Sequence, residues 1–200
     1  GVKRLPRADR ERQALEAART LFAARGFAAV TMDEVAAAIG VTKPLLYTYF
    51  GNKEQLFLAC MTPAGDALVE TVARALAPAG SPAAALRAGV HAFFAFVDAD
   101  RRAWRVLFDE TLHASGVLDA RAAQQRERLT ALIAANQLAR LPAERREAAR
   151  AEIEGLSAAL LAAAEALARW WLGTEAMPAA EAAELLVRTV EPGLRTAARV

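Results

Sequence analysis

The chain has 200 residues, of which 55% are apolar and 24% are charged, and this balance excludes an intrinsically disordered chain. A chain of this length buries a core without disulfide bonds, and its single cysteine, Cys60, excludes an intramolecular one. No apolar run reaches the roughly 18 residues that a membrane span needs, and the charged start lacks the apolar core of a secretory signal. We therefore expect a cytoplasmic protein that contacts no membrane.

The formal net charge of +2 is unevenly distributed along the chain. The first 60 residues carry nine basic and six acidic side chains, whereas the rest carry 16 basic and 17 acidic ones. A basic N-terminal segment on a nearly neutral body indicates a polyanionic partner, although three charges are a weak signal.

The predicted secondary structure is helical throughout, because Ala, Leu and Arg dominate and no stretch shows the apolar–polar alternation of a strand. In chain order, we expect helices at 9–25, 31–40, 42–50, from 52 onward, 82–99, 101–113, 116–139, 142–172 and from 178 onward. The fold class is therefore all-α, with about nine helices.

Local signals mark the ends of the first helices. Gly26 should end the first helix in a left-handed conformation, and Thr31 with Glu34 fits a capping box that opens the second. Gly40 should end that second helix, and Thr42 is expected to be the N-cap of the third.

Further signals come from prolines and one asparagine. Pro44 lies in the first turn of the third helix, where the missing N–H costs little, and Asn52 should cap the fourth helix. Pro63 is expected to kink or break that fourth helix. Pro142 and Pro178 should open the last two helices.

The segment 31–53, TMDEVAAAIGVTKPLLYTYFGNK, carries the most information about function. Two short helices flank a turn at 39–42, a pattern typical of a helix-turn-helix whose second helix lies in the DNA major groove. A lysine lies at each end of that helix, Lys43 and Lys53, and the phenols of Tyr47 and Tyr49 lie between them in the sequence. These groups are placed to reach phosphates.

At these residues the chain resembles the DNA-binding domain of the tetracycline-repressor (TetR) family of transcriptional regulators. The match covers 22–56 and is sharpest in GVTKPLLYTYFGNKEQLF. Two departures are Thr42, where Ser is commoner, which should preserve capping, and Pro44, where the family often has a small residue. The resemblance implies a DNA-binding domain at 1–58 and a helical ligand-binding and dimerisation domain at 59–200.

The resemblance and the helical phase together give a set of expected DNA contacts. Leu45 or Pro44 could touch a thymine methyl group, and Thr48 could bond base edges or phosphate. Alternative interpretations stay open: Tyr47 and Tyr49 as half-buried packing residues, and Lys53 as a solvated end-cap. The expected contact residues are Thr31, Thr42, Lys43, Pro44, Leu45, Tyr47, Thr48, Tyr49 and Lys53.

The second part of the chain is expected to hold a ligand pocket and a dimer surface. An aromatic-rich bundle interior suits an apolar or amphipathic small molecule, although a packed core is the alternative for each residue. The expected pocket residues are Phe57, Cys60, Met61, His91, Phe94, Trp104, Phe108 and His113. The expected dimer residues are Leu160, Leu167, Trp170, Trp171, Leu185 and Leu186.

Signals of catalysis are weak in this sequence. Glu110 and His113 have the spacing of half a di-iron motif, but two histidines and one cysteine do not form a typical metal site. We therefore expect no metal, no cofactor and no enzymatic activity.

The predicted function is a homodimeric repressor that an apolar small molecule releases from a palindromic operator in double-stranded DNA. The alternatives are a helical-bundle carrier or enzyme, and a DNA-binding activator without a small effector.

Overall fold

A computed structural model describes residues 6–101, 104, 116–174 and 176–197. By its internal contacts, the chain divides into two compact units. The N-terminal unit holds the described residues within 1–65 and 102–122, and the C-terminal unit holds those within 66–101 and 123–200. The domain boundary predicted at 58/59 therefore lies seven residues before this division, inside one continuous helix.

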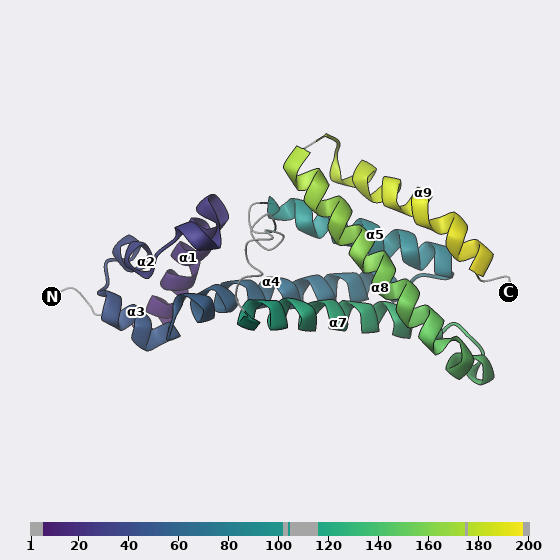
Figure 1. Ribbon diagram of the computed structural model, residues 1–200, viewed down its shortest axis with the longest axis horizontal. Helices are drawn as coiled ribbons and strands as arrows, with labels where there is room; N and C mark the ends of the chain where they lie inside the picture. The colour runs from purple at the N-terminus through teal and green to yellow at the C-terminus, as the bar shows by residue number, and fades with distance from the viewer. Residues whose placement is uncertain (1–5, 102–103, 105–115, 175, 198–200) are drawn as a thin grey trace. The chain divides into compact units, whose positions relative to one another are not determined.

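The N-terminal unit is built on α1 (Arg7–Ala29), α2 (Met32–Ala38), α3 (Lys43–Phe50) and the beginning of α4 (Lys53–Leu76) (Figure 1). Gly26 interrupts α1 with φ 80°, so the regular first helix ends there, as predicted. The capping box at Thr31 and Glu34 is present, and Asn52 accepts a hydrogen bond from the backbone N–H of Gln55 at 2.8 Å. These local predictions are confirmed.

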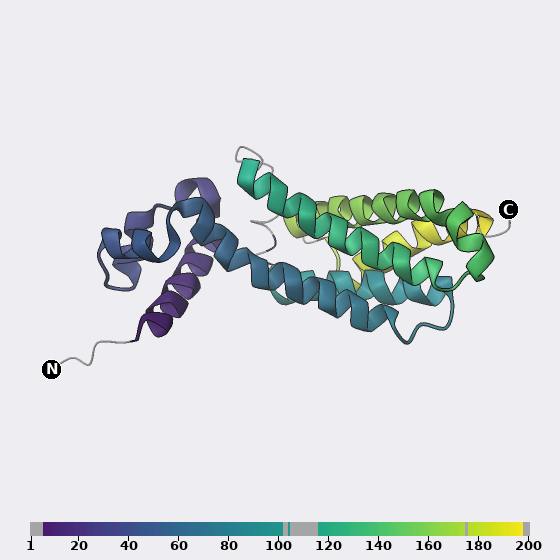
Figure 2. The same cartoon turned by 90° about the horizontal axis from the view of Figure 1, so that it is seen from below.

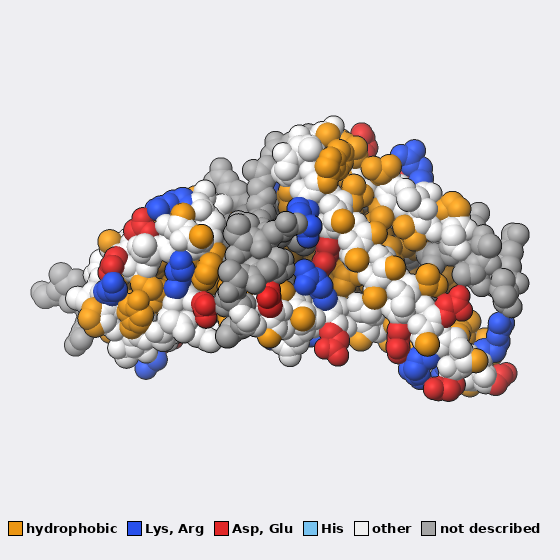
Figure 3. Space-filling model, in the orientation of Figure 1, with side chains coloured by type: hydrophobic (Ala, Val, Ile, Leu, Met, Phe, Trp, Pro, Cys, Tyr) orange, Lys and Arg blue, Asp and Glu red, His pale blue; other side chains and the backbone are white. Residues whose placement is uncertain are grey.

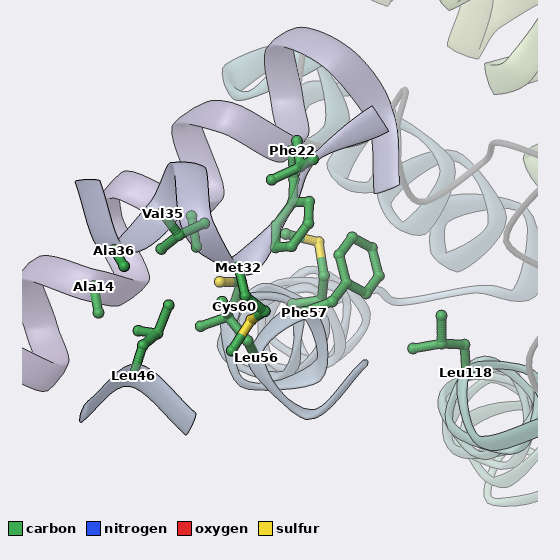
Figure 4. Packing of buried hydrophobic residues seen from close by; sticks show 13 residues of the cluster. Ala14, Phe22, Met32, Val35, Ala36, Leu46, Leu56, Phe57, Cys60 and Leu118 are labelled. Atoms are coloured by element: carbon green, nitrogen blue, oxygen red, sulfur yellow. The ribbon is translucent and has the colours of Figure 1, made fainter. Parts of the chain in front are cut away.

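The core of this unit is a cluster of apolar side chains from α1, α2, α3 and α4, together with Leu118 of α7 (Figure 4). Phe22 is fully buried and meets the ring of Phe57 edge-on, with 5.1 Å between the ring centroids. Phe27 packs on the same Phe57 ring at 5.1 Å. Leu46 is the one buried residue of α3, and its side chain packs in this cluster. This contact fixes the rotation of that short helix about its axis.

The C-terminal unit contains the second half of α4, α5 (Pro82–Ala99), most of α7 (Gly116–Leu138), α8 (Ala143–Thr174) and α9 (Ala179–Ala197) (Figures 1 and 2). α5 packs along α9, where the fully buried Ala85, Ala182 and Ala183 leave room for close approach. Trp171 of α8 is fully buried against Phe94, and its indole N–H donates to the carbonyl of Met177 at 2.7 Å.

The structure corrects two expectations about helix ends. α4 continues through Pro63 to Leu76 as a single helix, so of the kink or break expected at Pro63 the break is wrong. Thr42 occupies the N-cap position of α3 and its backbone carbonyl accepts from the N–H groups of Leu45 and Leu46, but its side chain makes no capping hydrogen bond. The helix expected at 101–113 lies almost entirely outside the described residues, in which eight helices are delineated.

One described helix, α4, is long and apolar enough to cross a membrane by length and composition. Leu56, Phe57, Cys60 and Met61 of this helix are buried in the core of the N-terminal unit. A core helix meets the same criterion, so we assign α4 to the core.

Candidate functional site

The turn between α2 and α3 places α3 with one face inward and one face outward. Gly40 has φ 65°, and the N–H of Val41 donates to the carbonyl of Ala36 at 3.0 Å, which closes the turn. Leu46 points into the core, whereas Tyr47 keeps 41% of its surface exposed. This is the geometry of a helix-turn-helix, in which the outward face of the second helix is free to enter a groove.

The side chains expected to contact DNA differ in how far they are exposed to solvent. Five of them are exposed on or just before α3, and Leu45 and Tyr49 are half-buried. The hydroxyl of Thr48 donates back to the carbonyl of Pro44 at 2.9 Å, so its oxygen remains available as an acceptor. The exposed five are Thr42, Lys43, Pro44, Tyr47 and Thr48.

Tyr49 and Thr31 have partners within the protein. The guanidinium of Arg7 lies 5.3 Å from the centroid of the Tyr49 ring, a cation–π contact that holds the start of α1 beside α3. Thr31 accepts from the N–H of Glu34 at 3.3 Å and donates its hydroxyl to the Glu34 carboxylate at 2.9 Å. Both residues therefore have structural roles in this unit.

Lys53 has the most extensive set of internal contacts among the expected DNA-binding residues. Its ammonium donates to the backbone carbonyls of Phe27 at 2.8 Å and Val30 at 3.0 Å, and more weakly to that of Ala28 at 3.4 Å. It also lies 4.4 Å from the centroid of the Phe27 ring. The first residue of α4 thus caps the junction between α1 and α2, a role that local sequence signals do not predict.

Charged pairs surround the same junction. Arg25 donates to the Glu34 carboxylate at 2.5 Å and to the carbonyl of Ala29 at 2.9 Å. The hydrogen bond from Arg25, followed by those from Thr31, lowers the pKa of Glu34 to about 2. The Lys43 ammonium pairs with Asp33 of α2 at 2.7 Å. In Figure 3, basic, acidic and apolar side chains are interspersed on the visible face of this unit.

The C-terminal unit contains a cavity of about 1300 Å³, partly open to solvent, between α4, α5, α7 and α8. Most of its wall is apolar, whereas the charged groups include Arg140, Glu144 and Arg145 at the turn from α7 to α8. Arg140 donates to the carbonyl of Ala79 at 2.8 Å, which ties this turn to the loop before α5. The apolar wall includes Val72, Leu76, Val90, Phe93, Leu129, Ile133 and Leu161.

None of the expected pocket residues that the structure describes lines this cavity. Phe57, Cys60 and Met61 belong to the core of the N-terminal unit, and burial raises the pKa of Cys60 to about 12. Trp104 is also buried and is grouped with that unit, whereas Phe108 and His113 lie outside the described residues.

On α5, the two expected pocket residues have partners other than this cavity. Phe94 packs on Trp171, and His91 lies 3.4 Å from the carboxylate of Glu184 on α9. Their neighbours Val90 and Phe93 line the cavity instead. The apolar spacing of Leu86, Val90 and Phe93 was the available signal for that wall.

The expected dimer residues fall into two groups, those buried inside the protomer and those at least partly exposed. Trp171 and Leu186 are buried inside the protomer, so they are unavailable to a partner and their assignment is corrected. Leu160 lines the cavity. Trp170 is 46% exposed, and Leu167 and Leu185 are half-buried, so these three stay predictions for the dimer surface.

Metal ligands do not cluster in the described part of the chain, where no group of three or more His, Cys, Asp or Glu side chains could hold an ion.

The fold and the turn geometry define an all-helical protein with an N-terminal helix-turn-helix. Residues 14–60 match the model of bacterial regulatory proteins of the tetR family, and residues 82–191 match that of the tetracyclin repressor-like C-terminal domain. The chain belongs to the TetR family.

Similar proteins agree with this assignment. A TetR-like transcriptional regulator from Rhodococcus sp. RHA1 is 34% identical, with a TM-score of 0.73 over 96% of this chain and 99% of that chain. The activator FasR from Mycolicibacterium smegmatis is 42% identical over 106 residues, which are 53% of this chain and 48% of that protein. The regulator AlkX from Mycobacterium tuberculosis is 33% identical over 105 residues, half of each chain. The chain thus spans about half the length of these curated relatives.

Proposed function

We propose that this protein is a dimeric, ligand-responsive transcriptional regulator that binds a palindromic operator through α3. The observation that carries the proposal is the two-sided α3, with Leu46 in the core and Lys43, Pro44, Tyr47 and Thr48 exposed on one short helix. A charged and apolar outward face on a rigidly packed helix suits both phosphate and base-edge contacts.

Dimerisation is proposed through α8 and α9. Trp170 is a large exposed apolar side chain, and Ala159, Ala162 and Ala166 on α8 are also exposed. Small residues beside an exposed tryptophan permit close packing of helices from two copies. A two-fold dimer presents two copies of α3 about 34–36 Å apart or at a multiple of that spacing, which matches a palindromic site.

The effector is proposed to be an apolar or amphipathic small molecule held in the cavity of the C-terminal unit. The largely apolar wall would bury its body, and the charged turn at Arg140 and Arg145 would orient a polar end. Val72 and Leu76 of α4 line the cavity, and Lys53 begins the same helix. Ligand entry would shift α4 and change the population of DNA-binding dimers, which needs a few kcal/mol of differential binding.

Repression is the direction of regulation that we propose, with release on ligand binding. Activation is the second candidate, because the similar FasR is described as an activator. A reporter gene behind the operator distinguishes them: deletion of the regulator raises expression under repression and lowers it under activation.

Footprinting on the DNA upstream of the protein's own gene tests the DNA-binding proposal. We expect a protected palindrome and a large loss of affinity in Lys43→Met. Arg150→Met removes the same charge from an exposed pair on α8 and should leave binding unchanged. If the protein protects no duplex but still binds apolar probe molecules, the helical-bundle carrier is favoured instead.

The cavity is tested with the fluorescent apolar anion 1-anilinonaphthalene-8-sulfonate. We expect saturable binding that Ala164→Phe, inside the cavity, abolishes, whereas Ala151→Phe on the exposed side of α8 does not. Equal binding by both variants would refute the effector site.

A further inference from the structure

An ion pair joins the two helices of the helix-turn-helix at its outer surface. The Nζ atom of Lys43, the first residue of α3, lies 2.7 Å from Oδ2 of Asp33, in the first turn of α2. Both side chains are exposed, by 49% and 62% respectively. Under the proposed function, the exposed face of α3 approaches DNA, and Lys43 belongs to that face.

Electrostatics explains why this pair forms. A cation at the N-terminus of a helix faces the positive end of the helix dipole, so the position of Lys43 on α3 is unfavourable by itself. Asp33 is favourable at the N-terminus of α2 for the same reason, and its carboxylate compensates for the position of Lys43. The hydrogen bond and the charge of Asp33 raise the pKa of Lys43 above its ordinary value.

The pair has a consequence for binding to arbitrary DNA. A duplex of any sequence attracts the protein mainly through phosphates, and each lysine that neutralises a phosphate releases counterions. A phosphate has to compete with the Asp33 carboxylate for the Lys43 ammonium, which weakens the contact between Lys43 and any phosphate. Contacts to the correct base edges add free energy that an arbitrary sequence lacks.

We propose that Asp33 is a specificity-determining residue that restrains Lys43 and so weakens sequence-independent binding to duplex DNA. The inference rests on the proposed DNA-binding function and assigns to α2 a role beyond support of α3. Asp33 acts through Lys43, so it is a positioning residue and needs no DNA contact of its own.

The test measures binding of Asp33→Asn to a random-sequence 30-base-pair duplex by fluorescence anisotropy between 50 and 200 mM salt. One additional phosphate contact makes the slope of log K against log[salt] steeper by about 0.9. We expect affinity at 100 mM salt to rise about five- to tenfold, and the loss of affinity across the salt range to grow about threefold.

Two controls separate this effect from a change in net charge. Asp9→Asn removes the same charge and breaks an exposed ion pair with Arg12 on α1, so it should change affinity less than twofold. In a Lys43→Met background, Asp33→Asn should have no more effect than this control. Circular dichroism checks that each variant remains helical.

Three results would overturn the inference. An affinity and salt slope unchanged in Asp33→Asn would refute it, as would an equal rise in Asp9→Asn or an undiminished effect in the Lys43→Met background. If the unmodified protein binds no duplex at 50 mM salt, the proposed function itself fails, which is a distinguishable outcome.

Discussion

Replacement of Lys53 by Met tests whether this residue holds the N-terminal unit together or binds DNA phosphate. The change removes an ammonium that donates to the carbonyls of Phe27 and Val30 and lies over the Phe27 ring. Hydrogen bonds to a charged group contribute about 1.5–3 kcal/mol, and a partly exposed cation–π contact adds about 0.5–1 kcal/mol. Since Lys53 is only half-buried, we expect the free energy of unfolding to fall by roughly 2–3 kcal/mol.

Urea denaturation followed by circular dichroism measures this loss. Lys43→Met is the matched control, because its ion pair with Asp33 is exposed and should contribute less than about 1 kcal/mol. The salt dependence of DNA binding supplies the second measurement. If Lys53 acts only within the protein, the slope of log K against log[salt] stays unchanged in Lys53→Met. A slope reduced by about 0.9 without loss of stability would refute our reasoning and support a phosphate contact.

Three further predictions concern a turn, a carboxylate and a surface. Gly40→Ala should destabilise the protein by about 1–2 kcal/mol in urea denaturation, because φ is 65° although an added Cβ meets nothing within 4 Å; a neutral effect would contradict the turn geometry. Glu34 has a folded-state pKa of about 2, below its ordinary value of 4.5, so its contribution to stability is present above pH 4.5 and is lost as pH falls toward 2. Acid titration of Glu34→Gln should therefore show a shallower loss of stability in that window than the unmodified protein, and identical profiles would exclude the Arg25 pairing. Trp170→Arg should yield a folded monomer in analytical ultracentrifugation, since its side chain is 46% exposed in the protomer, and a persisting dimer would exclude this residue from the interface.

Local chemistry made much of the fold predictable from sequence. Thr31 and Glu34 lie three residues apart and satisfy each other's backbone donors, so their capping box depends on no distant residue. The positive φ of Gly40 and the cap at Asn52 are equally local. The helix does not break at Pro63 because a proline removes one hydrogen bond, whereas the packing of Leu56, Phe57 and Cys60 in the core stabilises the helix on one side of it.

Tertiary structure alone decided which side chains face one another. Neighbours on a helix point about 100° apart, so the sequence could not tell that Trp171 is buried while Trp170 is exposed, or that Phe93 rather than Phe94 lines the cavity. Lys53 likewise finds its carbonyl partners more than 20 residues earlier in the chain, at Phe27 and Val30. The helices and their caps followed from interactions within a few residues, whereas the rotation of each helix and the partners of its charges depended on packing between distant segments.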